Sequence, residues 1–419
     1  MLAPLVAIAN ILVCVCGIVL SRSIFVIYWF GALFVTAPIA LDYATATYQR
    51  PVIALALGYC FLFNALLLST QILSGVDRRS RALARSIEVW PPLPGVCIVL
   101  AGLGVIMLLL SVPSLSALAE MRWDELAESR SGMEIVYINL SQTFTVLSTA
   151  IVVPALLSRR YLIPMVVVLA TVFAVALLTR SKAYALILTL PFLVYFALER
   201  DRLLSTRYFR RLAVLAVVFV LLYVGVEFAR WVGPLRGLLR GQSHGQVFVA
   251  VLSEPLEADL RRTYYAILEG FRERPTLRGA SYTRLLLVPI GRMLGVRVPE
   301  NPIYLYYGLT TPPGTSLLRG SNHPTIYGDS YANFREFGVF VAVGLALAVS
   351  ALWRWGLQHH RFLLWATVSV SSFGVPLILR GSVFYGLYAV TVGLVVAVVI
   401  DAFLRGAATG AFPVSEPHR

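Results

Sequence analysis

The sequence predicts an all-α, polytopic integral membrane protein with about 11 transmembrane helices and one large loop outside the bilayer. Hydrophobic residues make up 58% of the 419 residues and charged residues only 13%, against roughly 45–50% and about 25% in soluble domains. The mean hydropathy is +0.79. Apolar runs without charges, many of them near the roughly 20 residues that cross a bilayer as a helix, recur along the chain. A soluble enzyme is therefore disfavoured.

Each span is predicted from a charge-free run, because arginine or aspartate at the bilayer centre costs about 2.5–3.5 kcal/mol. The run over 161–198 is too long for one span, and Thr179-Arg180-Ser181-Lys182 interrupts it, so we expect two short helices joined by a tight turn. The predicted spans lie near Leu2 to Leu20, Ile24 to Leu41, Pro51 to Leu73, Leu93 to Leu118, Ile135 to Leu157, Leu162 to Leu178, Ala183 to Leu198, Leu212 to Val226, Val339 to Leu352, Phe362 to Leu379 and Val383 to Ile400.

The orientation follows from the arginine content of the short loops, because cytoplasmic loops are enriched in arginine and lysine. The first apolar stretch has no positively charged segment before it, so we expect it to remain as a span. The N-terminus is then outside and the C-terminus inside. The arginines that set this orientation are Arg22, Arg78, Arg79, Arg81, Arg85, Arg159, Arg160, Arg200, Arg202, Arg207, Arg210, Arg211, Arg354 and Arg361.

Four regions follow from this pattern. An N-terminal membrane region of about 8 spans covers 1–228, a large outer loop covers 229–336, a C-terminal membrane region with 3 spans covers 337–400, and a cytoplasmic tail covers 401–419. Within the loop, Leu256 to Phe271 has apolar residues at helical spacing, which predicts an amphipathic helix. Pro299, Pro302 and several glycines predict irregular backbone over 291–322.

Several kinds of chemistry lack their residues in this chain. Lys182 is the single lysine and is followed by Ala183, so there is no Walker A loop. There is no Asp-x-Asp pair, no HExxH and no histidine cluster, so no metal site is predicted. The four cysteines form no CxxC pair, and there is no Gly-x-Ser-x-Gly elbow. The charge of +14 is scattered along the chain, so nucleic acid is not an expected partner, and no cofactor is expected.

The remaining candidates for chemistry are cations on the outer side. One guanidinium group can donate two parallel hydrogen bonds to two phosphate oxygens. A cluster of such groups could stabilise the diphosphate leaving group of a lipid-linked substrate in place of a metal. The alternative is that these arginines only anchor helices at the membrane surface. The candidates for diphosphate binding are Arg180, Lys182, Arg261, Arg262, Arg284 and Arg292.

Two residues are the favoured proton acceptors for a sugar hydroxyl. His323 and Asp329 lie in a polar outer segment, and either could act as a general base, although a loop histidine or aspartate also serves as a structural hydrogen-bonding group. Rival acceptors are Glu254, Glu257 and Glu269, and His244, His359 and His360 are weaker candidates. Tyrosines that could stack on sugars, or belong to an interfacial belt, are Tyr264, Tyr265, Tyr282, Tyr304, Tyr306, Tyr307, Tyr327 and Tyr331.

Taken in order, these features resemble one family of membrane enzymes. The matching pieces are Thr179-Arg180-Ser181-Lys182 between two short spans, Arg262 on the loop helix, Gly279-Ala280-Ser281-Tyr282 leading to Val288-Pro289-Ile290-Gly291-Arg292, and His323-Pro324-Thr325 followed by Gly328, Tyr331, Asn333, Phe334 and Gly338. The chain is similar to the Wzy-type oligosaccharide repeat-unit polymerases of O-antigen and exopolysaccharide assembly, which are GT-C-like membrane glycosyltransferases. The topology matches throughout, and the motifs match from Arg180 to Gly338.

The resemblance implies a reaction at the periplasmic face of a bacterial inner membrane. A growing glycan would pass from undecaprenyl diphosphate to the non-reducing end of a new lipid-linked repeat unit, without a metal. The implied partners are this lipid-linked oligosaccharide and the membrane lipids, and a chain-length regulator and a flippase are left open. Two alternatives remain: an O-antigen ligase that transfers glycan to lipid A-core, and a non-catalytic transporter of lipid-linked oligosaccharide.

Overall fold

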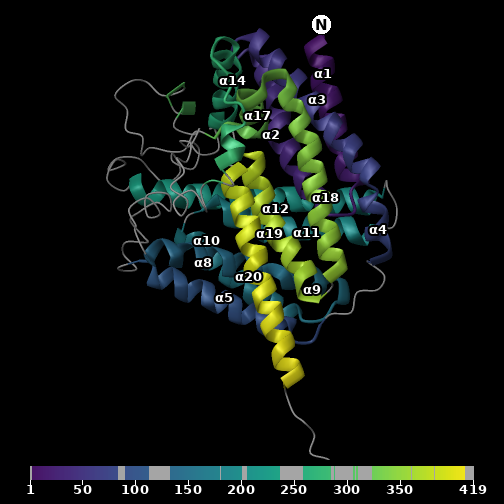
Figure 1. Cartoon of the computed structure of the whole chain (residues 1–419), viewed down its shortest axis with the longest axis vertical. Helices are drawn as coiled ribbons and strands as arrows, with labels where there is room; N and C mark the ends of the chain where they lie inside the picture. Colours follow the sequence, from purple (N-terminus) through teal and green to yellow (C-terminus); the bar gives the residue numbers. More distant parts are fainter. Residues whose placement is uncertain are drawn as a thin grey trace, which may run out of the picture.

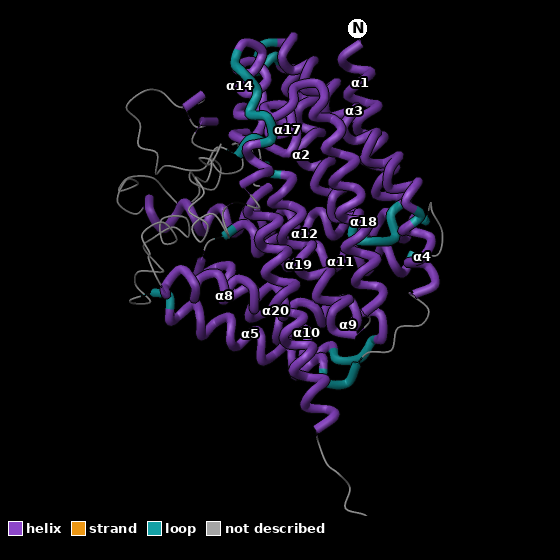
Figure 2. The backbone as a smooth tube through the Cα atoms, viewed as in Figure 1, coloured by secondary structure: helices purple, strands orange, loops and turns teal. Residues whose placement is uncertain are grey.

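A computed structural model gives an all-helical protein (Figures 1 and 2). It describes residues 2–83, 90–112, 133–179, 181–200, 205–235, 258–284, 287, 305–306, 308–309, 323–359, 361–381 and 383–410. Within these ranges there is no strand. They contain 11 helices long and apolar enough to cross a membrane, which confirms the predicted multi-pass architecture and the predicted number of spans.

The first group of helices is built on α3 (Arg50–Ser74), which packs against α1 (Leu2–Leu20), α2 (Phe25–Thr45) and α18 (Val341–His359). The short α4 (Val76–Leu83) follows α3 and lies beside α18. Pro51 stands in the first turn of α3, where its missing N–H costs no hydrogen bond. Helices from the two ends of the sequence therefore form one part of the bundle.

The second group comes from the middle of the chain. It contains α5 (Leu93–Leu110), α8 (Met133–Ser148), α9 (Val152–Ser158) and α10 (Leu162–Thr179). A 3₁₀ turn, η1 (Thr149–Ile151), separates α8 from α9. Pro154 explains the break, because proline has no N–H for the carbonyl of Ala150 and its ring crowds that carbonyl.

The long apolar run over 161–198 forms two helices, as predicted. The first is α10, which ends at Thr179, and the second is α11 (Lys182–Glu199). The next helix, α12 (Thr206–Leu235), packs mainly on α11. Because α12 continues to Leu235, it extends beyond the boundary expected at residue 228.

The helix α19 (Arg361–Leu379) lies at the centre of the bundle. In its membrane span, 89% of the residues are buried inside the molecule. It contacts α2, α11, α18 and α20 (Val383–Gly410). Two of its buried hydroxyls, those of Thr367 and Ser372, donate to carbonyls one turn back in the same helix, which satisfies them without water. The last helix, α20, continues past residue 400 into the expected tail.

Two further helices lie at one end of the bundle, which we call the α14 end (Figure 1). The predicted amphipathic helix is present as α14 (Ala258–Glu273). The short α17 (Thr325–Phe334) and the 3₁₀ turn η2 (Arg335–Phe340) precede α18 and were not predicted. In the stretch expected to be irregular, Leu305, Tyr306, Gly308 and Leu309 have helical backbone. The N-terminus of α1 lies at the same end of the molecule (Figure 1).

Polar side chains join α1, α2, α3 and α17 within the apolar core. The Asn64 amide oxygen accepts from the hydroxyls of Tyr28 at 2.8 Å and Tyr327 at 3.1 Å, and its amide nitrogen donates to Asn10 at 2.9 Å. All four side chains are buried. A buried polar group must be paired to avoid a desolvation penalty, so this network fixes how α17 sits on the bundle.

We expect Gly17→Ala to destabilise the fold. A Cβ at Gly17 would lie 2.1 Å from the ring of Trp29, and that buried ring is held by its hydrogen bond to Gln71 at 2.6 Å. Overpacking of this kind costs about 1–3 kcal/mol. The matched control is Gly58→Ala, where no atom lies within 4 Å of the new Cβ. Thermal unfolding in detergent should show a lower midpoint for the first variant alone, and equal midpoints would contradict the tight α1–α2 contact.

Candidate functional site

The loop helix α14 is attached to α2 and to the turn that follows it by charged and polar contacts. Arg261 Nε lies 2.7 Å from the Asp42 carboxylate, and the Tyr265 hydroxyl donates to the same oxygen at 2.7 Å. One turn further along α14, Glu269 accepts from the Tyr48 hydroxyl at 2.6 Å. These contacts come from three residues on successive turns of α14, namely Arg261, Tyr265 and Glu269. They therefore set both the position of the helix and its rotation about its own axis.

The tyrosine hydroxyls in these contacts are donors at neutral pH. Burial, together with the neighbouring Glu269 carboxylate, raises the pKa of Tyr48 to about 12. Burial and the hydrogen bond to Asp42 together hold the pKa of Tyr265 far above its usual range. Both groups therefore remain protonated, and neither can act as a general base.

A buried carboxylate on α17 joins three separate stretches of the chain. Asp329 is 2% exposed, and its two oxygens accept from the Tyr306 hydroxyl at 2.9 Å and the Ser281 hydroxyl at 3.1 Å. Asn333 donates to Ser281 at 2.7 Å and to the Asp329 carbonyl at 2.7 Å. Burial is the main cause that raises the pKa of Tyr306, and the negative charge of Asp329 is the second. The Tyr306 hydroxyl therefore stays protonated and remains a donor.

The backbone next to this cluster is also hydrogen-bonded to α17. Leu277 N–H donates to the Ala332 carbonyl at 2.9 Å, and Arg278 N–H donates to the Asn333 carbonyl at 3.2 Å. These carbonyls belong to the last turn of α17, where no helical partner is available. The expected proton acceptor Asp329 is thus placed at the centre of a buried cluster, where each of its carboxylate oxygens already accepts a hydrogen bond and little of the side chain reaches solvent.

The start of α17 is held against the turn between α19 and α20. Thr325 N–H donates to the Arg380 carbonyl at 3.0 Å, and a Cβ at Gly381 would lie 2.6 Å from the Thr325 nitrogen and 2.7 Å from the Pro324 ring. Thr325 has φ of 60°, which is a strained conformation for a β-branched residue. His323, the other expected proton acceptor, is half-buried and immediately precedes this junction.

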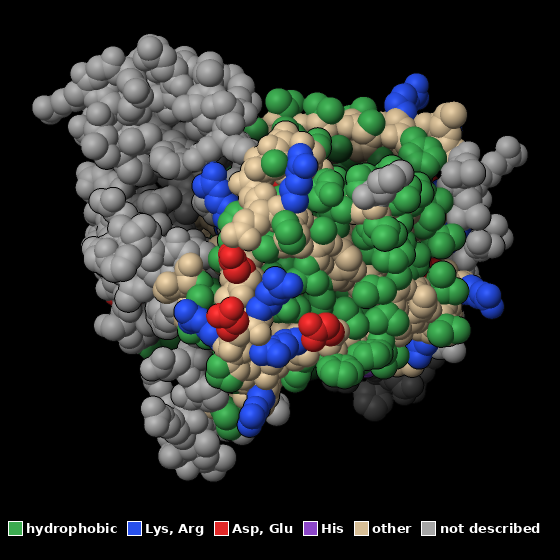
Figure 3. Space-filling view, turned by 90° about the horizontal axis from the view of Figure 1, so that it is seen from above, with side chains coloured by type: hydrophobic (Ala, Val, Ile, Leu, Met, Phe, Trp, Pro, Cys, Tyr) green, Lys and Arg blue, Asp and Glu red, His purple; other side chains and the backbone are tan. Residues whose placement is uncertain are grey.

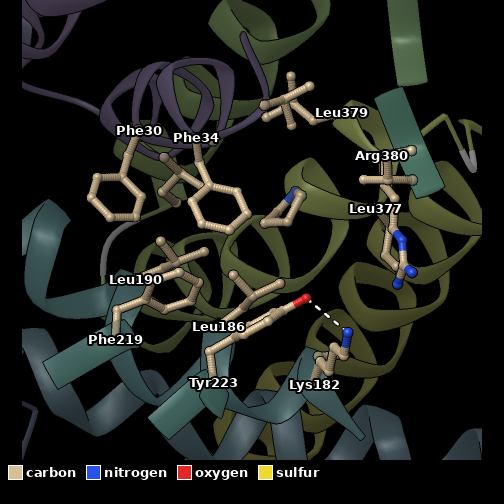
Figure 4. A pocket seen from close by; sticks show the side chains of 16 residues that line it. Phe30, Phe34, Lys182, Leu186, Leu190, Phe219, Tyr223, Leu377, Leu379 and Arg380 are labelled. Carbon is tan, nitrogen blue, oxygen red and sulfur yellow. Dashed lines mark hydrogen bonds between the residues drawn. The ribbon is translucent and has the colours of Figure 1, made fainter. Parts of the chain in front are cut away.

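An apolar cavity of about 90 Å³ lies beneath α14, between α2, α11, α12 and α19 (Figure 4). The polar groups on its wall are Lys182 at the start of α11, Tyr223 on α12 and Arg380 at the end of α19. Lys182 Nζ donates to the Tyr223 hydroxyl at 2.9 Å and lies 4.7 Å from the centroid of its ring. Apolar side chains complete the wall: Ile27, Phe30, Phe34, Val35, Ala183, Leu186, Leu190, Phe219, Leu260, Pro376, Leu377 and Leu379.

The expected diphosphate-binding residues are placed differently from one another. Lys182 lines the cavity, whereas Arg261 is buried in its ion pair with Asp42. Arg262 is exposed on α14 and has no hydrogen-bond or ion-pair partner among the residues that the structure describes. Arg284 lies over the ring of Phe384, 5.6 Å from its centroid. Arg180 and Arg292 lie outside the described residues. Viewed from the α14 end, basic and acidic side chains lie close together in one area of the surface (Figure 3).

The expected sugar-stacking tyrosines are placed mostly in the core. Tyr264 and Tyr327 are fully buried, and the Tyr264 hydroxyl donates to the Ala56 carbonyl at 3.3 Å. Tyr331 is 2% exposed and packs edge-on against Tyr59. None of these three rings presents a face that a sugar could reach. Tyr282 is half-buried and stacks on the more exposed Phe334, with ring centroids 5.9 Å apart.

The remaining candidates are separated from this site or lie outside the described residues. His359 bonds to the Trp355 carbonyl at the far end of α18. His244, Glu254, Glu257, His360, Tyr304 and Tyr307 lie outside the described residues, as does the segment from Val288 to Arg292. Within the described ranges, no three histidine, cysteine, aspartate or glutamate residues form a group that could hold a metal ion.

Two of the three polar residues on the cavity wall, Tyr223 and Arg380, were not among the candidates from the sequence. Arg380 offered a usable signal, since it is a lone arginine that follows a charge-free span and precedes Gly381 on the predicted outer side. Tyr223 gave no signal, because a tyrosine near the end of a span is typical of an interfacial belt.

The protein was compared with known proteins in three ways. No protein-family model, no curated protein and no solved structure matches the chain.

We expect the Asp42–Arg261 ion pair to be important for the docking of α14. Its two side chains are 13% and 6% exposed, and removal of one partner of a buried pair costs about 3–5 kcal/mol because the other charge remains unpaired. Arg261→Met should therefore lower the free energy of unfolding by about that amount, and adding Asp42→Asn should restore part of it.

The control for this pair is Arg272→Met, which changes an exposed arginine on the same helix. It should alter stability by no more than about 0.5 kcal/mol. The coupling energy between Asp42 and Arg261 is measured by a double-mutant cycle. The cycle compares the unchanged protein, Arg261→Met, Asp42→Asn and the double variant. A coupling energy of zero would mean that α14 is held by its apolar face alone.

Proposed function

We propose that this chain is a membrane glycosyltransferase that polymerises polyprenyl-diphosphate-linked oligosaccharide repeat units. The growing glycan is transferred from its lipid diphosphate to the non-reducing end of a new lipid-linked unit. In this proposal the α14 end faces the periplasm of a bacterium, and the membrane is the inner membrane.

The observation that carries this proposal is the junction of α17 with α19. One backbone hydrogen bond, from Thr325 to Arg380, joins the segment of His323 to the residue whose side chain lines the apolar cavity. The same cavity holds Lys182 at its wall. A candidate base, two cations and an apolar cavity are the three features that transfer from a lipid diphosphate requires.

In the proposed reaction, the oxygen of an acceptor sugar hydroxyl attacks the anomeric carbon of the donor glycan. The bond between that carbon and the diphosphate oxygen breaks, and polyprenyl diphosphate leaves with the bonding electrons. His323 accepts the hydroxyl proton, and Lys182 and Arg380 stabilise the negative charge that develops on the diphosphate. Arg262, exposed and unpaired on α14, is positioned to contact phosphate or glycan at the same end of the molecule.

Asp329 receives a different role in this proposal from the one its sequence position suggested. The Asp329 carboxylate is buried and each of its oxygens accepts a hydrogen bond. We therefore assign Asp329 a positioning role, in which it holds Ser281 and Tyr306 against α17. Arg261 likewise positions α14, and Tyr264, Tyr327 and Tyr331 pack the core. Tyr282, with Phe334 behind it, is the tyrosine best placed to contact sugar.

The alternative functions use the same elements in other ways. An O-antigen ligase would use the same donor with lipid A-core as acceptor, and His323 suits it equally. A transporter should carry charges along a cavity through the bilayer, whereas the charged side chains on the described spans, such as Asp42, Lys182 and Glu199, lie towards helix ends. This placement favours a transferase over a transporter.

Deletion of the gene in the source bacterium tests the proposal, with surface and lipid-linked glycans separated on a gel. Single repeat units in place of long chains are the expected result. Long chains that remain on the lipid carrier would identify a ligase. Repeat units trapped on the cytoplasmic side would identify a transporter and would end the catalytic proposal.

A further inference from the structure

Four aromatic rings close the cavity on one side. Phe30 and Phe34 come from α2, and Phe219 and Tyr223 come from α12. The ring of Phe219 lies edge-on to Phe30 at 5.8 Å and to Phe34 at 5.7 Å, and Tyr223 lies 6.2 Å from Phe34. We call these four residues the aromatic seam.

The two helices that carry the seam pack mainly on other helices. The main contacts of α12 are with α11, and those of α2 are with α1, α3 and α19. The seam is therefore closed by side chains rather than by close backbone packing. Rotation of rings takes place without unfolding a helix, so the seam opens without the loss of helical hydrogen bonds.

Apolar residues next to the seam face away from the protein. Val217, Val218 and Leu221 on α12 are exposed, although they lie in a membrane span. Exposed apolar side chains on a spanning helix face lipid, so the outer side of the seam borders the hydrocarbon of the bilayer. An apolar chain in the bilayer thus reaches the cavity through the seam without crossing water.

The two cationic side chains of the cavity wall, Lys182 and Arg380, lie on the side away from Phe30 and Phe219 (Figure 4). In Figure 4, Lys182 and Arg380 lie towards the right of the view and the rings of Phe30 and Phe219 towards the left. Tyr223 belongs to both parts, because its ring is in the seam and its hydroxyl accepts from Lys182 at 2.9 Å. The wall thus suits a molecule with an anionic head and a long apolar chain.

We propose that the aromatic seam between α2 and α12 is a lateral entry for the apolar chain of a polyprenyl-diphosphate lipid, and that the cavity holds the part of this chain nearest the diphosphate. This inference rests on the proposed function for the identity of the lipid. The seam itself is defined by the ring contacts of Phe30 and Phe34 on α2 with Phe219 and Tyr223 on α12. The seam is thus a determinant of specificity for the lipid tail, separate from the residues that bind the sugar.

The test uses the full-length protein in phosphatidylcholine nanodiscs with a farnesyl diphosphate probe that carries a diazirine on its chain. Ultraviolet light should attach the probe to peptides of α2 and α12, as identified by mass spectrometry. Unlabelled undecaprenyl diphosphate should suppress the labelling, and the same concentration of phosphatidylglycerol should not. Labelling spread evenly over the exposed spans would contradict a specific entry, and equal suppression by phosphatidylglycerol would show a site for bilayer phospholipid.

Variants on the cavity wall separate the entry from general folding. Leu186→Trp places bulk in the cavity and should lower labelling roughly tenfold, which corresponds to about 1.4 kcal/mol of lost affinity. The control is Leu177→Trp, at a position that is 42% exposed on α10, and its labelling should be unchanged. Both variants must elute as monodisperse protein before they are compared.

A second variant keeps the inference testable if Leu186→Trp does not fold. Replacing Phe30 and Phe34 with leucine retains apolar surface but removes two rings of the seam. The probe should then attach to the cavity faster than in the unchanged protein. An unchanged rate would mean that the rings do not control entry.

The outcomes distinguish this inference from the proposed function. If the gene deletion removes long chains but the probe avoids α2 and α12, the polymerase remains and the lateral entry is wrong. If the probe labels the seam and undecaprenyl diphosphate competes, but the deletion leaves long chains intact, the entry stands and the polymerase assignment is wrong.

Discussion

Arg380→Gln is expected to lower the rate of glycan chain extension about 10²- to 10³-fold. Arg380 ends the central helix α19 and lines the cavity together with Lys182. Loss of one preorganised donor that stabilises developing charge costs about 2.7–4 kcal/mol in the transition state, which is the source of this factor. Glutamine retains a polar side chain with an N–H donor, but it is shorter than arginine and has no positive charge.

The backbone of Arg380 is not altered by this substitution. Its carbonyl still accepts from Thr325 N–H, so the junction of α17 with α19 should remain intact. The measurement is single-turnover extension of lipid-linked repeat units by purified protein in nanodiscs. Arg272→Gln, at an exposed position on α14, is the matched control and should extend chains at an unchanged rate. Full activity of Arg380→Gln would remove this residue from the diphosphate site.

His323→Gln is expected to reduce the same rate by about 10² to 10⁴, the usual contribution of a general base. The loss should appear in kcat while KM for the lipid-linked donor stays near its original value, because the proposed contacts to diphosphate come from Lys182 and Arg380. A purely structural role of His323 would instead lower the amount of folded protein or raise KM.

The control for His323 is His359→Gln at the other end of α18. The His359 ring contacts Trp355 and its carbonyl and lies far along the helix from the α14 end. This variant should extend chains normally. If His323→Gln keeps full kcat, another acceptor must take the proton, and Asp329 would become the next residue to change.

Asp329→Asn should have a different signature from His323→Gln if Asp329 positions other residues. Its two oxygens hold Tyr306 and Ser281, and asparagine retains only one acceptor oxygen. We therefore expect Tyr306→Phe to reproduce much of the loss caused by Asp329→Asn, and the double variant to be little worse than either single variant. Additive losses in the extension rate would contradict the positioning role.

The sequence was sufficient for the membrane-spanning part of the fold. Hydropathy along the chain located the 11 spans and the division between α10 and α11, and apolar residues at helical spacing located α14. These features are local, because the cost of placing a charge in the bilayer and the periodicity of a helix depend only on neighbouring residues.

The sequence was insufficient for the site because the site is made by helices far apart in the chain. Lys182 was a candidate from its position between two spans, but its meeting with Tyr223 and Arg380 depends on how α11, α12 and α19 pack. The short helix α17 was missed because Thr325, Asp329, Ser330 and Asn333 interrupt its apolar residues, and burial against α14 and α3 stabilises it rather than its own apolar pattern.

The roles of individual polar residues were likewise decided by tertiary structure. Arg261 and Arg262 are adjacent in sequence and equivalent in chemistry, yet α14 turns the first into its ion pair with Asp42 and the second into solvent. A helix advances by about 100° per residue, so neighbouring side chains point in different directions and only the docking of the helix decides which is buried. The sequence by itself thus determined the spans and the amphipathic helix, and the tertiary packing alone decided which cations and hydroxyls surround the cavity.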